Sequence, residues 1–241
     1  MDTLRTPFQG VWNIIRFNWH FYVGAGGVMV IMAWLHWYPA IALLLVPTVM
    51  TLLVSMYIYD FSGLYCLLWI EPGQASMVVN IHAGFDETSA ILVRKFPGAR
   101  FLVFDFYNPV KHTEVSVRRA RRAYPAFSGT QRIDTSVIPL EDGVADRILV
   151  TFSAHEIRND VERVFFFKEL KRALHTSGHI QVTEHLRDLP NLLGYNVGSL
   201  HFLSRKRWLL TFAAAGLRVR REKKVNPFIT TFILEKYDPL S

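Results

Sequence analysis

The sequence predicts an α/β protein in which an N-terminal pair of transmembrane helices precedes a doubly wound sheet of seven strands. Three observations predict this arrangement. No Asp, Glu, Lys or Arg occurs between Phe17 and Tyr59. From Met77 onward, short apolar runs alternate with amphipathic stretches, which is the pattern of βαβ units. The last two predicted strands follow each other without a helix, so we expect an antiparallel hairpin at the end of the sheet.

The charge-free segment is long enough for two membrane spans of roughly 20 residues each. We expect helices at about 18–37 and 39–59, with Pro39 in the first turn of the second helix and aromatic residues at both membrane interfaces. A cleavable signal peptide is the alternative, but the apolar run is too long and begins too late for one. Residues 60–70 are apolar all round, which predicts an interfacial helix at the entrance of the domain formed by 71–241.

The formal charge of +7 lies entirely in residues 71–241, because Asp2, Arg5, Arg16 and Asp60 cancel within the first seventy residues. Two spans return the chain to its starting side, and the arginines on that side place it in the cytoplasm by the positive-inside rule. A basic domain beside an apolar anchor is expected to face the anionic lipids of the inner (cytoplasmic) membrane. Nucleic acid is the competing partner for such a charge, and the anchor disfavours it.

The short apolar runs and the amphipathic stretches between them define the elements of the domain. Strands are expected at Met77–Ile81, Arg100–Phe104, Gln131–Ile133, Arg147–Phe152, His179–Thr183, Leu217–Arg221 and Phe228–Leu234. Helices are expected at Glu87–Lys95, Thr113–Ala123, Val161–Leu174 and Arg205–Ala215. In open sheets of this kind ligands bind beyond the carboxyl ends of the strands. The polar residues that follow each strand are therefore the candidate site.

The loop after the first strand is the first candidate for binding a cofactor. It contains Asn80, His82, Ala83 and Gly84, and Asp86 is a plausible cap of the following helix. Gly84 is its one glycine, and glycine permits a ligand to approach the backbone closely.

Asp105 follows the second strand about twenty residues later, where an acidic side chain can accept hydrogen bonds from both hydroxyls of a ribose. Phe106, the next residue, could stack on an adenine ring. A helix-capping role is the alternative for Asp105.

Residues 132–159, RIDTSVIPLEDGVADRILVTFSAHEIRN, carry the most specific pattern in the chain. They resemble the segment of ubiquinone- and menaquinone-pathway methyltransferases in which an acid precedes a Pro-Leu/Phe loop, an Asp-Gly turn and the fourth strand. The first loop stands where such enzymes have a D-x-G-x-G-x-G turn, although only Gly84 of those glycines is present. The order of elements over about 72–237 resembles the Rossmann-like sheet of class I S-adenosylmethionine-dependent methyltransferases, with its antiparallel last strand.

The resemblance implies S-adenosylmethionine as the cofactor and a role for each candidate residue. Asp134 would meet the adenine amino group with Thr135 beside it, and Ser153 to Glu156 would line the methyl-transfer face. His155 is the candidate general base because imidazole titrates near neutrality. His155 and Glu156 could instead only cap or orient the following helix.

The candidates for substrate contact follow the fifth strand. They are Glu184, His185 and, in the apolar insertion Leu189–Leu203, Tyr195. A metal site is not expected, since the single Cys66 excludes a cysteine-based zinc site and no conventional ligand spacing occurs.

The expected function is a membrane-anchored methyltransferase that acts on a lipophilic acceptor, such as a quinone precursor, an aryl-polyene pigment or another lipid. The degenerate first loop keeps open a second hypothesis, a catalytically inactive methyltransferase fold that serves as a scaffold or binding module at the membrane. A nicotinamide-dependent reductase is disfavoured by the terminal hairpin and by the absence of a G-x-G-x-x-G motif.

Overall fold

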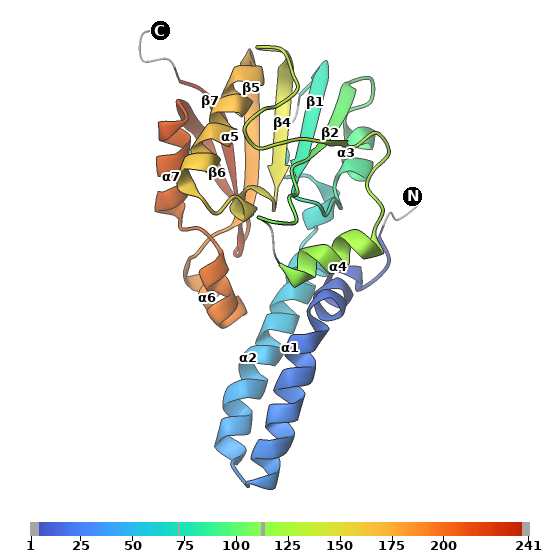
Figure 1. Cartoon of the computed structure of the whole chain (residues 1–241), viewed down its shortest axis with the longest axis vertical. Coiled ribbons are helices and arrows are strands. Elements are labelled where there is room, and N and C mark those ends of the chain that lie inside the picture. Colours follow the sequence, from blue (N-terminus) through green and yellow to red (C-terminus); the bar gives the residue numbers. More distant parts are fainter. Residues whose placement is uncertain (1–4, 72, 112–113, 238–241) are drawn as a thin grey trace.

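The computed structural model describes residues 5–71, 73–111 and 114–237, and its centre is a seven-stranded mixed sheet. The strand order is β3-β2-β1-β4-β5-β7-β6 (Figure 1). The strands are β1 Met77–His82, β2 Arg100–Asp105, β3 Gln131–Arg132, β4 Ala145–Thr151, β5 Leu174–His185, β6 Leu217–Asn226 and β7 Ile229–Lys236. The first five are parallel, whereas β7 lies between β5 and β6 and is antiparallel to both. The predicted seven strands and antiparallel last strand are confirmed.

Helices cover both faces of the sheet, as a doubly wound fold requires. On one face, α5 (Asp160–Ala173) and α7 (Arg205–Ala214) bury their aromatic rings, including Phe166 and Trp208, against the strands. On the other face, α3 (Ser89–Lys95) packs together with residues 64–70. The start of each helix on the first face is fixed by a capping side chain, since Asn159 and Ser204 each accept a hydrogen bond from the backbone three residues later.

The shorter elements lie near the carboxyl ends of the parallel strands. Helix α4 covers Val115–Ala123, and the predicted start of this helix at Thr113 lies outside the described residues. The apolar insertion after β5 forms α6 (Leu189–Tyr195) and a 3-10 turn at Asn196–His201.

Residues 60–70 do not form the interfacial helix that the sequence predicted. Helix α2 (Tyr38–Met56) continues as a π-helical turn to Phe61, and a single 3-10 turn follows at Leu64–Cys66. Gly63 and Leu67 have left-handed backbone conformations that end these turns. The side chains of Leu64, Leu67, Trp69 and Ile70 are buried in a core cluster with residues of the sheet. Most of the apolar side chains in this segment therefore serve the core, although Phe61 and Leu68 are exposed, and composition alone did not distinguish this arrangement from a membrane interface.

Helices α1 (Gln9–Trp34) and α2 form an antiparallel pair that projects from the edge of the sheet at which the parallel strands end (Figure 1). Many large apolar side chains on both helices are exposed, among them Trp34 at 79% and Leu43 at 79%. In the described part of the chain, one helix is long and apolar enough to cross a membrane, namely Tyr38–Cys66, and 11% of its most apolar stretch is buried. The structure therefore supports one candidate span where the sequence predicted two.

The base of the helical pair is held by Asp60, whose carboxylate accepts hydrogen bonds from the backbone of Gly10 and Val11 at 2.7 and 2.9 Å. A carboxylate is stabilised at this end of a helix because the first backbone N–H groups are unpaired and carry partial positive charge. Gly10 permits the close approach, since a Cβ there would lie 2.3 Å from Cβ of Tyr59.

We expect Gly10→Ala to lower the free energy of unfolding by about 1–3 kcal/mol, the usual effect of overpacking a close contact. Gly26→Ala is the matched control, because a Cβ at this position of the same helix meets no atom within 4 Å. The control should be neutral or slightly stabilising, since alanine favours a helix over glycine. Thermal unfolding of both variants in detergent measures the difference, and equal melting temperatures would contradict the tight contact at Gly10.

His179 of β5 is buried beside Arg147 of the neighbouring strand β4. Burial, followed by the charges of Arg147 and Arg220, lowers the pKa of the imidazole to about 4 against the opposing charge of Glu71. In the unfolded chain a histidine titrates near pH 6.5. Between pH 6.5 and 4 the unfolded state therefore binds a proton at His179 that the folded state does not bind. The free energy of unfolding that is present above pH 6.5 is lost as the pH falls toward 4.

His179→Gln removes this proton uptake. We expect the dependence of unfolding free energy on pH between 6.5 and 4 to become shallower by about one proton, or roughly 1.4 kcal/mol per pH unit. Unfolding curves recorded at several pH values test the expectation, and parallel profiles for the variant and the wild type would refute it.

Candidate functional site

A cavity of about 720 Å³ lies where the carboxyl ends of the parallel strands meet the helical pair. Its walls come from α1, α4, the loops after β1, β4 and β5, and the 3-10 turn that follows α6. Six of the residues predicted from the sequence line it: His82, Ala83, His155, Glu156, His185 and Tyr195. The apolar contribution of α1, from Ile14, Phe17 and Phe21, was not foreseen.

Three buried side-chain donors in the cavity wall, on His82, Asn13 and Tyr195, lack a partner within the described residues. Nδ1 of His82 accepts a hydrogen bond from the backbone of Gly84 at 3.0 Å, which places the ring proton on Nε2, and Nε2 has no partner. Asn13 of α1 uses its Oδ1 to accept a hydrogen bond from Tyr124, while its Nδ2 has no partner. Because an unsatisfied buried donor is costly, these groups indicate a ligand that offers acceptors here.

Asn80 lies outside the cavity wall because the fold uses its side chain. Its amide donates to the hydroxyls of Thr88 and Ser89 at 3.1 and 2.8 Å. Asp86 accepts from the backbone N–H of both residues, so the two side chains together fix the start of α3. The capping role predicted for Asp86 is present in the structure.

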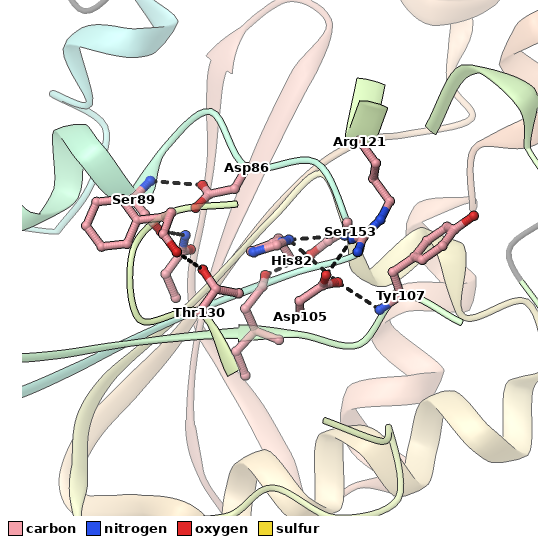
Figure 2. A network of polar contacts seen from close by, with 12 residues as sticks. His82, Asp86, Ser89, Asp105, Tyr107, Arg121, Thr130 and Ser153 are labelled. Atoms are coloured by element: carbon pink, nitrogen blue, oxygen red, sulfur yellow. Dashed lines mark hydrogen bonds and ion pairs between the residues drawn. The ribbon is translucent and has the colours of Figure 1, made fainter. Parts of the chain in front are cut away.

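Asp105 ends β2 as predicted, and its carboxylate is already paired. It accepts a hydrogen bond from the backbone of Tyr107 at 2.9 Å and a second from Nη1 of Arg121 at 2.5 Å (Figure 2). The Arg121 side chain, which reaches down from α4, also lies against Gly84, where a Cβ would be 2.6 Å from the same Nη1. Arg121 thus fills the space between Gly84 and Asp105, and neither of these residues lines the cavity.

A second, smaller cavity of about 180 Å³ lies between the ends of β2 and β3 and is lined by Phe106, Asp134 and Thr135. The proposal that the Phe106 ring stacks on adenine is wrong, because this ring is buried in the core against Phe166 at a centroid distance of 5.4 Å. Thr135 donates a hydrogen bond to Glu162 at 2.5 Å. Backbone and hydroxyl hydrogen bonds from Ser136 lower the pKa of the exposed Asp134 carboxyl.

His155 lies between two carboxylates. Its Nδ1 is 2.8 Å from Oε2 of Glu184, and its Nε2 is 3.2 Å from Oε1 of Glu156. Burial alone would lower the pKa of this imidazole, but the two carboxylates outweigh burial and raise it to about 10. His155 is therefore protonated near neutral pH, and the expectation that it titrates there is wrong. Glu184 stands behind the ring and is not part of the cavity wall.

His201 adds a second imidazole to this cluster. Its Nδ1 is 2.9 Å from Oε1 of Glu114, and its Nε2 is 3.8 Å from Oε1 of Glu156. Burial would lower the pKa of His201, but the nearby carboxylates raise it. The two imidazoles in turn hold the pKa of the Glu156 carboxyl far below its usual range, although burial opposes this.

His185 and Tyr195 line the cavity next to α6. The ring nitrogens of His185 are paired, with the Tyr59 hydroxyl at 2.9 Å and with Oδ1 of Asn191 at 3.0 Å, and the ring stacks on Phe202. Burial lowers the pKa of His185 to about 4, so it is neutral. Burial raises the pKa of the Tyr195 hydroxyl to about 12. Ser153, also predicted for the site, donates to the carbonyl of Ile81 and ties the β4 loop to β1.

Sequence reasoning missed four polar residues of this region: Asn13, Glu114, Arg121 and His201. Arg121 and its neighbours in α4 formed a visible basic run, but nothing in that run indicated which arginine turns toward Asp105. Asn13, Glu114 and His201 come from three segments far apart in the sequence, and only the tertiary fold brings them to one cavity.

Comparison with known proteins identifies the fold. No protein-family model matches the sequence, and no curated protein matches it in sequence. Among solved structures, a SAM-dependent methyltransferase from Aquifex aeolicus matches with a TM-score of 0.53 and 18% identity, over 78% of this chain and 97% of that one. The chain has the S-adenosylmethionine-dependent methyltransferase fold.

Two further structures with this methyltransferase fold are similar over most of the chain. Human N-acetylserotonin methyltransferase in complex with SAM matches with a TM-score of 0.54 and 15% identity, over 80% of this chain and 57% of its own. Mitomycin 7-O-methyltransferase matches with a TM-score of 0.52 and 18% identity, over 97% of this chain and 74% of its own.

The methyltransferase fold implies S-adenosylmethionine, and the residues present offer suitable partners for it. Asp105 provides the carboxylate at the end of β2, and at present it receives only N–H donors, which ribose hydroxyls could replace. His82 and Asn13 provide buried donors without partners. The group fits once the guanidinium of Arg121 leaves the space beside Gly84, and this side chain is long and 21% exposed.

Proposed function

We propose that this protein is an S-adenosylmethionine-dependent methyltransferase that a two-span helical hairpin anchors in the membrane, and that its acceptor is lipophilic. The observation that carries the proposal is the position of the large cavity. It opens between the ligand-binding edge of a methyltransferase sheet and the base of an exposed apolar helical pair. A quinone precursor, an aryl-polyene pigment or another lipid is concentrated in the bilayer, beside this cavity.

The proposed cofactor site follows the edge of the sheet. Asp105 would hold the ribose, Asp134 and Thr135 the adenine end beside the backbone of Phe106, and the loop of His82, Ala83 and Gly84 the amino-acid end. When bound, S-adenosylmethionine supplies an electrophilic methyl group. Asn80 and Ser153 support this site from outside the cavity by fixing the loops after β1 and β4.

The proposed acceptor site is the remainder of the cavity. His155 and Glu156 form its polar end, with Glu184 fixing the His155 ring from behind. His185 and Tyr195, together with Phe17 and Phe21 of α1, form an aromatic wall. Apolar walls favour burial of a greasy acceptor, and a few polar groups suffice to orient it. Orientation matters because methyl transfer needs an in-line approach.

The basic helix α4 supports placement at an anionic, cytoplasmic membrane face. Arg119 donates to the carbonyl of Phe17 at 2.6 Å, which fastens α4 to α1 where the helical pair leaves the domain. Arg118 and Arg122 on the same helix are exposed. Basic side chains near a membrane surface attract anionic headgroups by about 1 kcal/mol each.

Two measurements test the proposal. Calorimetric titration of the full chain in detergent with S-adenosylmethionine and its demethylated product should give one site for each. Incubation with methyl-labelled S-adenosylmethionine and a lipid extract of the host should then yield a labelled lipid that mass spectrometry identifies. If neither compound binds at millimolar concentration, the catalytic proposal fails.

The second candidate function is a catalytically inactive scaffold at the membrane, and Arg121 is the observation that favours it, because a guanidinium fills the cofactor cradle. Absence of cofactor binding together with stable membrane attachment would support this alternative.

A further inference from the structure

Two imidazoles and one carboxylate converge on the wall of the large cavity. His155 and Glu156 come from the loop after β4, and His201 comes from the 3-10 turn that precedes α7. One ligand atom from each lies within 4.8 Å of the others. Nε2 of His155 is 3.2 Å, and Nε2 of His201 is 3.8 Å, from the same Oε1 of Glu156.

Both imidazoles are oriented by a second carboxylate on the opposite side of the ring. Glu184 holds Nδ1 of His155 at 2.8 Å, and Glu114 holds Nδ1 of His201 at 2.9 Å. Each ring therefore presents Nε2 toward Glu156. In protein metal sites a ligating histidine commonly donates its other ring N–H to a carboxylate, which fixes the ring and raises its basicity. This arrangement occurs here twice, around one shared carboxylate.

We propose that His155, Glu156 and His201 bind a divalent transition-metal ion, and that Glu184 and Glu114 orient the two imidazoles. Two imidazole nitrogens with one carboxylate oxygen suit zinc, iron or manganese, whereas magnesium and calcium prefer oxygen ligands. Donors on one such ion lie roughly 3–3.5 Å apart, given metal–ligand bonds of about 2.0–2.2 Å. The two Nε2–Oε1 separations of 3.2 and 3.8 Å are close to that spacing, and all three residues line the cavity.

The charges around the cluster favour a cation. The carboxylates of Glu156, Glu184 and Glu114 surround the two imidazoles. The guanidinium of Arg158 already lies at this cluster, where its Nη2 contacts the ring nitrogens of His201. Arg158 must turn away before a metal ion binds. Its side chain is 42% exposed and can reach solvent. The cation site shares His155 and Glu156 with the proposed acceptor site. Its test is separate from that of the proposed methyl transfer, because metal binding is measured without cofactor or acceptor.

The test uses the full chain in detergent, purified without a polyhistidine tag and stripped with a chelator. Titration calorimetry with zinc chloride should give one site, and cobalt(II) at the same site should give a visible absorption band from mixed nitrogen and oxygen ligation. His201→Ala should weaken zinc binding at least tenfold. Glu114→Gln should weaken it by about 10–100-fold, the usual effect of losing an orienting carboxylate. His175→Ala is the matched control, since this histidine is exposed at the far end of β5.

Each outcome decides the proposal. Unchanged zinc affinity in His175→Ala, together with the expected losses in the other two variants, supports the site. The proposal is overturned if the wild type binds no zinc, if His201→Ala binds it as tightly as the wild type, or if His175→Ala loses as much affinity. His201 is 30% exposed at the surface of the cavity. Near-ultraviolet circular dichroism of each variant verifies that the fold is retained.

Discussion

Arg121→Ala and Asp105→Ala are expected to change the affinity for S-adenosylmethionine in opposite directions. Arg121 donates a charged hydrogen bond to the Asp105 carboxylate, which the ribose would otherwise contact, and its side chain fills the space beside Gly84. A hydrogen bond to a charged group contributes about 1.5–3 kcal/mol. A cofactor that must break this bond binds more weakly by at least about tenfold. Arg121→Ala should therefore tighten binding by about tenfold or more while lowering the melting temperature, because Asp105 then loses its partner.

Asp105→Ala removes the carboxylate itself. We expect the affinity to fall by roughly 10–150-fold, which corresponds to the same 1.5–3 kcal/mol. Arg122→Ala is the matched control for both variants, because Arg122 follows Arg121 on α4 and its side chain is exposed. Calorimetric titration with S-adenosylmethionine and its demethylated product measures all three. Weaker binding by Arg121→Ala would mean that Arg121 holds the ligand, and unchanged binding by Asp105→Ala would remove Asp105 from the site.

The sequence predicted the soluble fold well because each element depends mainly on local patterning. Buried strands such as β4 are short apolar runs in the sequence. The strands β6 and β7 could be predicted to be antiparallel because no helix separates them. The prediction of an interfacial helix at residues 60–70 was wrong for a physical reason. An apolar segment has the same composition whether it is buried against a sheet or in lipid. Here the left-handed residues Gly63 and Leu67 interrupt the helix, and the packing of Leu64, Trp69 and Ile70 places the segment against the sheet.

Only those residues of the candidate site that lie at the strand ends could be predicted, because the topology of the sheet places them together. His82 and His185 are the last residues of parallel strands, His155 follows a third strand, and all three line one cavity. The side chains that pair with these residues could not be predicted from the sequence. Asp105 pairs with Arg121, 16 positions away, and this pairing fills the space beside Gly84. His155 pairs with Glu184, 29 positions away, and this pairing favours the charged imidazole. The near-neutral titration expected of His155 was wrong because it treated the imidazole without those carboxylates.

The same dependence on tertiary partners explains the absence of a predicted metal site. His155 and Glu156 are adjacent, whereas His201 lies 45 positions after Glu156 (201 − 156) in an apolar insertion that carries no ligand pattern of its own. Metal-ligand motifs are recognisable in a sequence when one helix or one loop supplies two or more ligands at fixed spacing. Here the spacing is set by how the insertion folds back onto the loop after β4.

Leu43→Lys together with Val46→Lys is expected to release the protein from the membrane. Both side chains are exposed on α2, at 79% and 60%. Val46 lies beside the midpoint of this helix, and Leu43 lies about one turn before it. A lysine at the centre of a membrane helix costs about 2.5–3.5 kcal/mol of insertion free energy. Two such residues therefore cost roughly 5–7 kcal/mol, enough to move most of the chain out of the bilayer. Extraction of host membranes at alkaline pH, followed by detection in the pellet and the supernatant, measures the change.

The matched control places the same two charges on the soluble domain. Val137→Lys with Val161→Lys alters side chains that are 60% and 64% exposed, so it should leave the protein in the pellet and its melting temperature nearly unchanged. If the wild type itself is extracted at alkaline pH, α2 does not span a bilayer and the exposed apolar surface of the helical pair must be covered in another way. If the α2 variant stays in the pellet, the lysines do not face lipid. The cavity would then lose its proposed route to a bilayer-dissolved acceptor, because that route depends on the helical pair holding the edge of the sheet at the membrane.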